Sequence, residues 1–421
     1  MCKHKKHFPL YFFLVMLCMK VSAAEQIQGI GIHANKYNKS SDAILSLISR
    51  SGFDSFRQDL AWNDIEVTKG HYSIPSKLEI NDVLIKQASD HNLSPLVILG
   101  YGNNNYNAGG YPTTGQDIKA FSDYAKWVAT RYKGKVPYYE IWNEWTVGTG
   151  MKGKGDIPSS DVYLQLVKET SIAIKSVDPS AKILAASMNP ISPNGRRLNI
   201  SDTAWFNQLI DRGIFNYIDG ISIHPYSFLN ADKSLRNPEY NIKKIDDFYN
   251  SIKLKNPKGI PIYITEVGVP THAGLGGVSE EQAADFIVKY TILAKSKSYI
   301  KGVWWYDLRD DGKDSDDQEH NFGFYNYEFN PKQAVIAFTN INKLLKNMII
   351  TSVVIGESKS DQQVTVSLND SAKNESHKIK WNETQLQQNG RFKALNLKTS
   401  NSDSMPVNYD ENKLSRDVYF K

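Results

Sequence analysis

Eight short apolar runs recur along most of the chain, and longer amphipathic stretches lie between them. Strands of a parallel sheet that are covered by helices on both faces read as nearly continuous apolar runs. Eight strand-then-helix units in succession predict an α/β fold, a (β/α)8 TIM barrel. The predicted strands cover residues 29–34, 55–62, 95–101, 138–145, 182–188, 220–226, 261–268 and 302–308.

Amphipathic stretches between these runs have apolar residues at helical spacing. The alternative architecture is a doubly wound open sheet, which usually has a glycine-rich phosphate turn after its first strand. Here the first strand continues into HANKYNKSS (33–41), which has no such turn, and this favours the barrel. The clearest predicted helices cover residues 41–52, 117–134, 161–178, 279–298 and 331–346.

The first 24 residues have the order of a secretory signal peptide. A basic start is followed by an apolar run from Phe8 to Met19 and by small residues at 22–24. An uncleaved membrane anchor is the alternative, but the run is shorter than the roughly 20 residues that a membrane-spanning helix needs. We therefore expect cleavage, a secreted or periplasmic protein, and no integral membrane span in the mature chain.

Composition restricts the chemistry of that mature chain. Cys2 and Cys18 both lie within the signal peptide, so its removal excludes disulfides, a cysteine nucleophile and thiolate metal sites. The formal charge of +5 includes four signal-peptide lysines, so the mature protein is nearly neutral. A nearly neutral protein lacks the excess positive charge that attracts nucleic-acid phosphates, so nucleic-acid binding is not expected. A neutral chain rich in Tyr and Trp favours neutral ligands over phosphate backbones.

The composition changes at about residue 347. Residues 25–347 are predicted to form the barrel, and residues 348–421 a small accessory antiparallel β domain, sandwich-like, built from short alternating runs. Trp381 lies in this second region. A lone tryptophan in a small β domain is expected to be a core residue rather than a sugar-binding one.

Polar residues lie at the ends of most predicted strands. The working residues of a (β/α)8 barrel emerge at the carboxyl ends of its strands, so this pattern predicts an active-site rim. The strand-end residues are Arg57 and Asp59 on the second strand, Asn143 and Glu144 on the fourth, His224 and Tyr226 on the sixth, Glu266 on the seventh, and Trp305 and Asp307 on the eighth.

The fourth run, YYEIWNEW (138–145), carries two glutamates in apolar surroundings. As a continuous strand it would place Glu140 and Glu144 on one face, about 13 Å apart in depth at roughly 3.3 Å per residue. We interpret Glu140 as a structural carboxylate paired with a buried cation, because an unpaired buried carboxylate is costly. Glu144, at the rim, is the reactive candidate, and a strand-end salt bridge is its alternative.

Glu266 ends the seventh run, which faces the fourth across a barrel of eight. Two carboxylates across one cleft are the minimal equipment for cleaving a glycosidic bond, provided that one is protonated and the other ionised. Arg57 is a candidate for keeping Glu266 ionised, since a nearby cation favours the charged form. Tyr226 is a candidate hydrogen-bond donor to the same carboxylate.

WNE (142–144), TE (265–266), Arg57, HPY (224–226) and an aromatic residue on the eighth strand together resemble the retaining glycoside hydrolases of clan A over about residues 28–346. FRQDLAWNDIE (56–66) and WWYDLRDDG (304–312) are similar to family 39, which includes β-xylosidases, and the build resembles bacterial exopolysaccharide glycosidases. The resemblance implies that Glu144 is the acid/base and Glu266 the nucleophile.

The resemblance also assigns binding roles. Asn143 is expected to contact the sugar 2-hydroxyl, Trp305 to form the floor under the sugar, and Arg57, His224 and Tyr226 to complete the site. His33 is expected either to line the sugar pocket or to be a structural histidine. The carboxyl groups of a retaining enzyme lie about 5–5.5 Å apart. Alternatives are an inactive carbohydrate-binding protein and a transglycosylase on the same scaffold.

Neither a metal nor an organic cofactor is expected. The acidic loop at 309–320 lacks the ligand spacing of an EF-hand, and the histidines form no zinc signature. The loop at 101–115 is rich in Asn, Gly and Tyr, which suits either sugar binding or a plain loop. The loop at 146–160 is interpreted as a flap whose lysines meet an acidic polysaccharide or are simply solvated.

Overall fold

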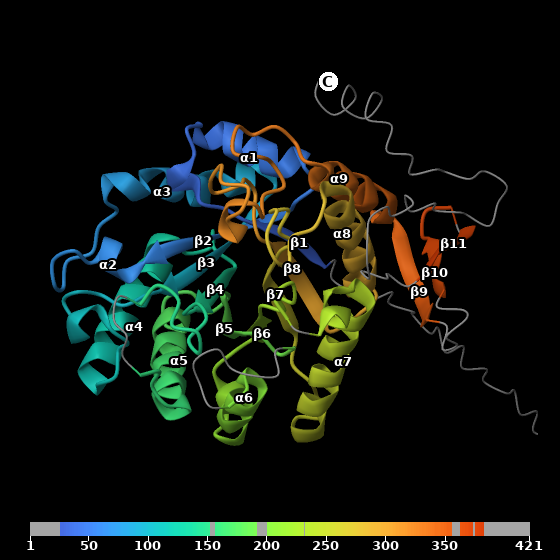
Figure 1. Cartoon of the computed structure of the whole chain (residues 1–421). Helices are drawn as coiled ribbons and strands as arrows, with labels where there is room; N and C mark the ends of the chain where they lie inside the picture. Colours follow the sequence, from blue (N-terminus) through green and yellow to red (C-terminus); the bar gives the residue numbers. More distant parts are fainter. Residues whose placement is uncertain are drawn as a thin grey trace, which may run out of the picture.

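The computed structural model describes residues 26–151, 156–191, 200–230, 232–355, 363–373 and 375–382. Eight parallel strands close into a barrel in the order of the sequence, as Figure 1 shows, so the predicted fold is confirmed. The strands are β1 (Ile27–Gly31), β2 (Ser55–Ala61), β3 (Ser94–Gly100), β4 (Tyr138–Ile141), β5 (Lys182–Met188), β6 (Gly220–Ile223), β7 (Ile262–Val267) and β8 (Ile300–Trp305).

Helices surround the barrel. Each of the five predicted helices is present, and α2, α3, α6 and α7 occur in addition. Their starts follow local rules: Thr114 and Ser279 form capping boxes, and Pro238 occupies the first turn of its helix. The helices are α1 (Ser41–Arg50), α2 (Trp62–Ile65), α3 (Glu79–Gln87), α4 (Gly115–Arg131), α5 (Ser160–Lys175), α6 (Asp202–Asp211), α7 (Pro238–Lys255), α8 (Glu280–Lys295) and α9 (Gln333–Leu345).

The lower part of the barrel interior is a packed core. Its side chains come from β3, β5, β7 and β8 and fill the interior in layers, as in other barrels of this type. A Cβ atom on Gly29 would lie only 2.1 Å from the indole of Trp304, so glycine on β1 makes room for that ring. The interior cluster consists of Leu96, Ile98, Leu184, Tyr263 and Trp304. This layer fills the barrel beneath the carboxyl ends of the strands, and Ile98 of the layer also lines the cavity described below.

A separate three-stranded antiparallel sheet follows the barrel, in the order β11-β10-β9. Trp381 is buried in it and donates from Nε1 to Oε1 of Glu239 on α7 at 2.7 Å, so it is a core residue, as expected. The sheet comprises β9 (Met348–Ile355), β10 (Gln363–Asp370) and β11 (Glu375–Asn382). The predicted signal peptide and the part of the predicted C-terminal domain beyond residue 382 lie outside the described residues, so those boundaries stay predictions.

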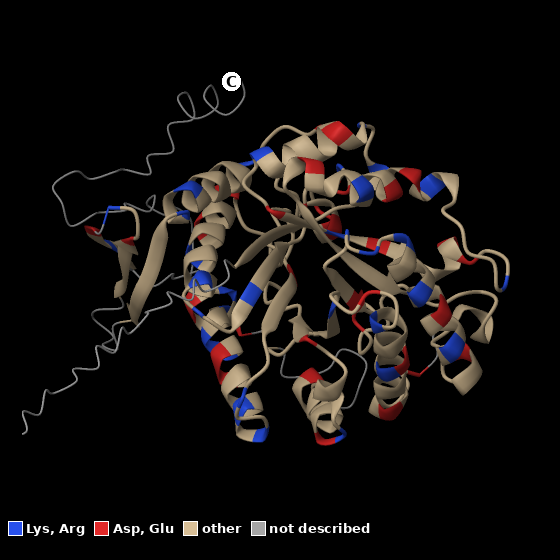
Figure 2. Ribbon diagram, turned by 180° about the vertical axis from the view of Figure 1, so that it is seen from behind, with Lys and Arg blue, Asp and Glu red and all other residues tan. Residues whose placement is uncertain are grey.

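Charged residues are mixed over the outside of the barrel. Figure 2 shows Lys and Arg interspersed with Asp and Glu along the helices. Within the described ranges, no helix is both long enough and apolar enough to span a membrane.

Candidate active site

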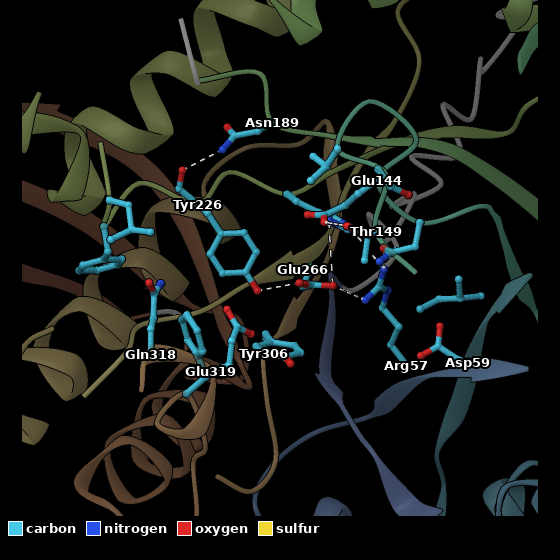
Figure 3. A pocket seen from close by; sticks show the side chains of 18 of the residues that line it. Arg57, Asp59, Glu144, Thr149, Asn189, Tyr226, Glu266, Tyr306, Gln318 and Glu319 are labelled. Carbon is cyan, nitrogen blue, oxygen red and sulfur yellow. Dashed lines mark hydrogen bonds and ion pairs between the residues drawn. The ribbon is translucent and has the colours of Figure 1, made fainter. Parts of the chain in front are cut away.

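A cavity of about 590 Å³ opens at the carboxyl ends of the strands. It brings together residues of β2, β3, β5 and β7 and of the segments that follow β1, β3, β4, β5, β6 and β8. Figure 3 shows a close view of it. Seven of the eight predicted site residues line this cavity: His33, Arg57, Asn143, Glu144, His224, Tyr226 and Glu266.

Trp305 is the exception, and its predicted placement is wrong. Its side chain is fully buried and packs against Tyr290, Phe324 and Phe338, with ring centroids 5.6–6.4 Å apart. Side chains alternate along a strand, so Trp304 faces the barrel interior, Trp305 faces the surrounding helices, and the next residue faces inward again. That residue, Tyr306, lines the cavity in the place predicted for Trp305.

Glu140 lies at the bottom of the site and has no exposed surface. Nε of Arg57 donates to it at 2.8 Å, and the hydroxyls of Ser187 and Thr265 each donate at 2.7 Å. Burial disfavours its ionisation, but the charge of Arg57 and the hydrogen bonds outweigh that effect, so the pKa of Glu140 lies well below its ordinary value. Arg57 is thus the buried cation that the sequence predicted for Glu140.

Arg57 also organises the cavity above this pair. Nη1 donates to Oε2 of Glu266 at 2.6 Å, and Nη2 donates to Oδ1 of Asn143 at 2.8 Å. With Oδ1 of Asn143 engaged, the group that this amide can offer to a ligand is its Nδ2 donor. The buried guanidinium of Arg57 therefore holds three side chains in place. They are the structural carboxylate of Glu140, the candidate reactive carboxylate of Glu266 and the candidate sugar-binding amide of Asn143.

Glu266 is held at both carboxylate oxygens. Oε2 accepts from Arg57, and Oε1 accepts from the hydroxyl of Tyr226 at 2.7 Å, as Figure 3 shows. Burial and the Glu266 charge raise the pKa of Tyr226 well above its ordinary value, so the phenol keeps its proton and remains a donor. Both partners predicted for Glu266 are therefore in contact with it.

Glu144 lies in a turn rather than on a strand, which corrects the prediction of one continuous strand. β4 ends at Ile141, and the left-handed φ angles of Trp142 (65°) and Glu144 (48°) turn the chain. The expectation that period two aligns Glu144 with Glu140 is therefore wrong. The turn nevertheless points Glu144 into the cavity, where Oε2 accepts from the hydroxyl of Thr149 at 2.6 Å.

His224 links the carboxylates. Nδ1 lies 3.1 Å from Oε1 of Glu144, and Nε2 lies 3.1 Å from the hydroxyl of Thr265. Burial disfavours its charged form, but Glu266, Glu140 and Glu144 outweigh this and raise the pKa of His224 to about 9. The ring is therefore a cation at neutral pH, and Nδ1–H donates to Glu144.

This pKa predicts how stability depends on pH. Because the folded pKa of about 9 exceeds the unfolded value of 6.5, the charged ring stabilises the fold fully below pH 6.5, and the contribution is lost as the pH rises through 9. The charged ring stabilises the folded state by roughly 3 kcal/mol, because each unit of pKa difference corresponds to about 1.4 kcal/mol. Urea unfolding should therefore show a steeper loss of stability between these pH values in the wild type than in His224→Gln. Parallel pH profiles would contradict this role.

Among the residues that the structure describes, two groups of side chains have the composition of a metal site. They are Glu144, His224 and Glu266, and His33, Asp307 and Asp311. In the second group Nδ1 of His33 lies 3.0 Å from Asp311 and 3.6 Å from Asp307. Burial lowers the pKa of His33, but the hydrogen bond to Asp311 and both acidic charges outweigh it and raise the pKa. We assign both groups to ion pairing of a histidine with carboxylates.

The loops contribute lining residues that sequence reasoning did not single out. Of the loop at 101–115, Tyr101 lines the cavity and donates to Asp59 at 3.0 Å, whereas Asn103 bonds to backbone carbonyls and holds the loop in place. Thr149 and Glu319 also line the cavity. No periodicity marks such residues, because loops that fold over a cavity follow neither the helix nor the strand repeat. Lys152 and Lys154 of the predicted flap lie outside the described residues.

Comparison with known proteins identifies the family of the chain. A sequence model of the cellulase family, glycosyl hydrolase family 5, matches residues 19–308. A search of curated proteins found no match. Among solved structures, a family 39 glycoside hydrolase from the gut symbiont Bacteroides cellulosilyticus WH2 is similar, with 22% identity over 86% of this chain and 71% of the other, at a TM-score of 0.69.

Two further structures share the fold. A GH5_18 protein from Bifidobacterium longum subsp. infantis has 13% identity, covers 76% of this chain and 79% of its own, and gives a TM-score of 0.58. Xylanase 10B from Thermotoga petrophila RKU-1, in complex with xylobiose, has 16% identity, 76% and 94% coverage, and a TM-score of 0.53. Family 5 is part of clan A, so the predicted resemblance is confirmed. The chain therefore belongs to the cellulase family, glycosyl hydrolase family 5, and is a glycoside hydrolase.

Proposed function

We propose that this chain is a secreted retaining glycosidase that cleaves O-glycosidic bonds of a polysaccharide or oligosaccharide by double displacement. Glu144 is the acid/base and Glu266 the nucleophile. The observation that carries the proposal is that one carboxylate oxygen of Glu144 and one of Glu266 lie within 4.8 Å of each other in a single cavity. Retaining enzymes place their carboxyl groups about 5–5.5 Å apart, whereas inverting enzymes leave about 6.5–9.5 Å for a water molecule.

The first step forms a covalent glycosyl-enzyme. Glu266 attacks the anomeric carbon while protonated Glu144 gives its proton to the leaving oxygen, so that the glycosidic bond breaks. Arg57 and Tyr226 each donate a hydrogen bond to one oxygen of Glu266. These bonds fix the conformation of the side chain, so the carboxylate is already oriented for attack. Asn143 offers Nδ2 to a hydroxyl of the sugar at this stage.

The second step releases the sugar. Glu144, now ionised, takes a proton from a water molecule, and the oxygen of that water attacks the anomeric carbon and displaces Glu266. The charged ring of His224 and the hydroxyl of Thr149 donate to the two oxygens of Glu144. These donors stabilise the ionised carboxylate and direct it at the water molecule in this step.

The anomeric configuration of the first product tests this mechanism. A polysaccharide panel would identify a cleaved polymer, and proton NMR during the first minutes of cleavage would report the new reducing end. We expect the product to have the same configuration as the bond that is cleaved. A product of inverted configuration would contradict the double displacement and require a water molecule between the two carboxylates.

We also propose that the protein leaves the cytoplasm after removal of residues 1–24, and that a bacterial exopolysaccharide is among its substrates. The order of basic, apolar and small residues supports the first point. The resemblance of its build to exopolysaccharide glycosidases supports the second. Amino-terminal sequencing of the exported protein should begin at residue 24 or 25, and the panel should include any polymer that the producing cell makes.

A further inference from the structure

We propose that Glu319 makes the catalytic cavity reject sugars that carry a negative charge, so that the substrate is a neutral or amine-bearing carbohydrate. The inference rests on the function proposed above and adds the substrate class. Glu319 belongs to the loop after β8 and lies in a short 3-10 helix, Gln318–His320. In Figure 3 its side chain points into the cavity beside Tyr306 and near Glu266.

The cations that line the cavity are already paired with acids. Arg57 donates to Glu140 and Glu266, and Nδ1 of His224 lies 3.1 Å from Glu144. Nδ1 of His33 lies 3.0 Å from Asp311. Among the lining residues that the structure describes there is no lysine and no second arginine. A sugar carboxylate that entered would therefore have to compete with an internal acid for each positive charge among these described lining residues.

Glu319 differs from the other acids of the cavity. Within the described part of the chain its carboxylate has no hydrogen-bond or ion-pair partner, whereas Asp59 accepts from Tyr101 and lies in the field of Arg57. Glu319 is exposed by accessible surface area, and the burial that remains, followed by the charges of Glu266, Asp317 and Glu144, raises its pKa. The acidic surroundings thus already disfavour one more negative charge at this position.

A ligand meets this carboxylate in one of two ways. Hydroxyl and ammonium groups of a sugar can donate to it, whereas a uronate or another acidic substituent would face it without a counter-ion. Like charges brought together at the rim of the cavity repel each other, and solvent screens this repulsion only in part. Glu319 therefore acts as a specificity residue that contacts the substrate, and it has no part in making or breaking the glycosidic bond.

The test uses one polymer in two forms. A neutral polysaccharide that the enzyme cleaves is converted to a hydroxyethylated form and a carboxymethylated form with equal degrees of substitution, so that the substituents differ chiefly in charge. The ratio of kcat/KM for the two forms is measured for the wild type, Glu319→Gln and Glu319→Ala. Asp316→Asn is the matched control, because it makes the same charge change on the same loop outside the cavity lining.

We expect the wild type to prefer the hydroxyethylated form by at least about tenfold, and both Glu319 variants to reduce this ratio about fivefold or more. Asp316→Asn should keep the wild-type ratio. An unchanged ratio in the Glu319 variants, an equal loss on both forms, or a wild-type preference for the carboxymethylated polymer would overturn the inference. Failure of the proposed function would be distinct, since it would show as inverted product or as no cleavage of any polymer.

Discussion

Glu266→Gln should lower kcat by roughly 10³-fold or more while the protein stays folded. Removing the group that attacks the anomeric carbon removes the covalent route altogether, and losses of this size or larger follow the loss of a catalytic nucleophile. The amide keeps the shape of the side chain, and Arg57 keeps Glu140 as its buried partner. Initial rates on the polymer identified by the panel, together with circular dichroism, measure the two parts of this prediction.

The control is Glu281→Gln, which makes the same substitution at an exposed position on α8. It should leave both rate and fold unchanged. Near-normal turnover by Glu266→Gln would remove Glu266 from the role of nucleophile, and unfolding of the variant would show that the carboxylate is chiefly structural.

Arg57→Leu should lower the free energy of unfolding by about 3–5 kcal/mol, the usual cost of removing one partner of a buried ion pair. Glu140 has no exposed surface, so it would be left as a buried charge with only hydroxyl donors and a neighbouring histidine. The loss of stability arises chiefly because the charge of Glu140 stays buried without a cation, and less from the lost attraction between Arg57 and Glu140. Urea unfolding at neutral pH measures it.

Lys119→Leu provides the comparison, because Lys119 and Asp123 form an exposed ion pair on α4. Exposed pairs contribute about 0–1 kcal/mol, so this variant should be nearly as stable as the wild type. A cost below about 1 kcal/mol for Arg57→Leu would mean that Glu140 becomes protonated or solvated without difficulty, and that the pair does not hold the floor of the site together.

The barrel could be predicted because each of its strands is marked by the residues within a short stretch of sequence. Each strand is a short apolar run, and β7, for example, is buried along almost its whole length. The same logic placed Arg57 and Glu266 at one rim, since the carboxyl ends of parallel strands meet at one end of a barrel. Helices such as α7 were not among the predicted ones, although Pro238 at its start and its amphipathic pattern were signals for it.

The errors have two sources: an alternation that was not applied on β8, and segments where the chain leaves regular structure. Trp305 was assigned to the cavity although the alternation along β8 turns it toward the helices and gives the position to Tyr306. Glu144 reaches the cavity through a left-handed turn, which period two cannot describe. Glu319 lies in a loop whose path over the cavity depends on tertiary packing, and a run of acids in the sequence gives no indication of which one points inward.

The most direct test of the convergence of Glu144 and Glu266 is to trap the covalent intermediate. A 2-fluoro glycoside of the sugar that the panel identifies, with a good leaving group, would be incubated with the enzyme, and the labelled peptide would be sequenced by mass spectrometry. We predict that the added mass lies on Glu266 and that Glu144→Ala still forms the labelled enzyme when the leaving group needs no protonation. A label on another residue, or an active wild-type enzyme that never acquires one, would contradict the account.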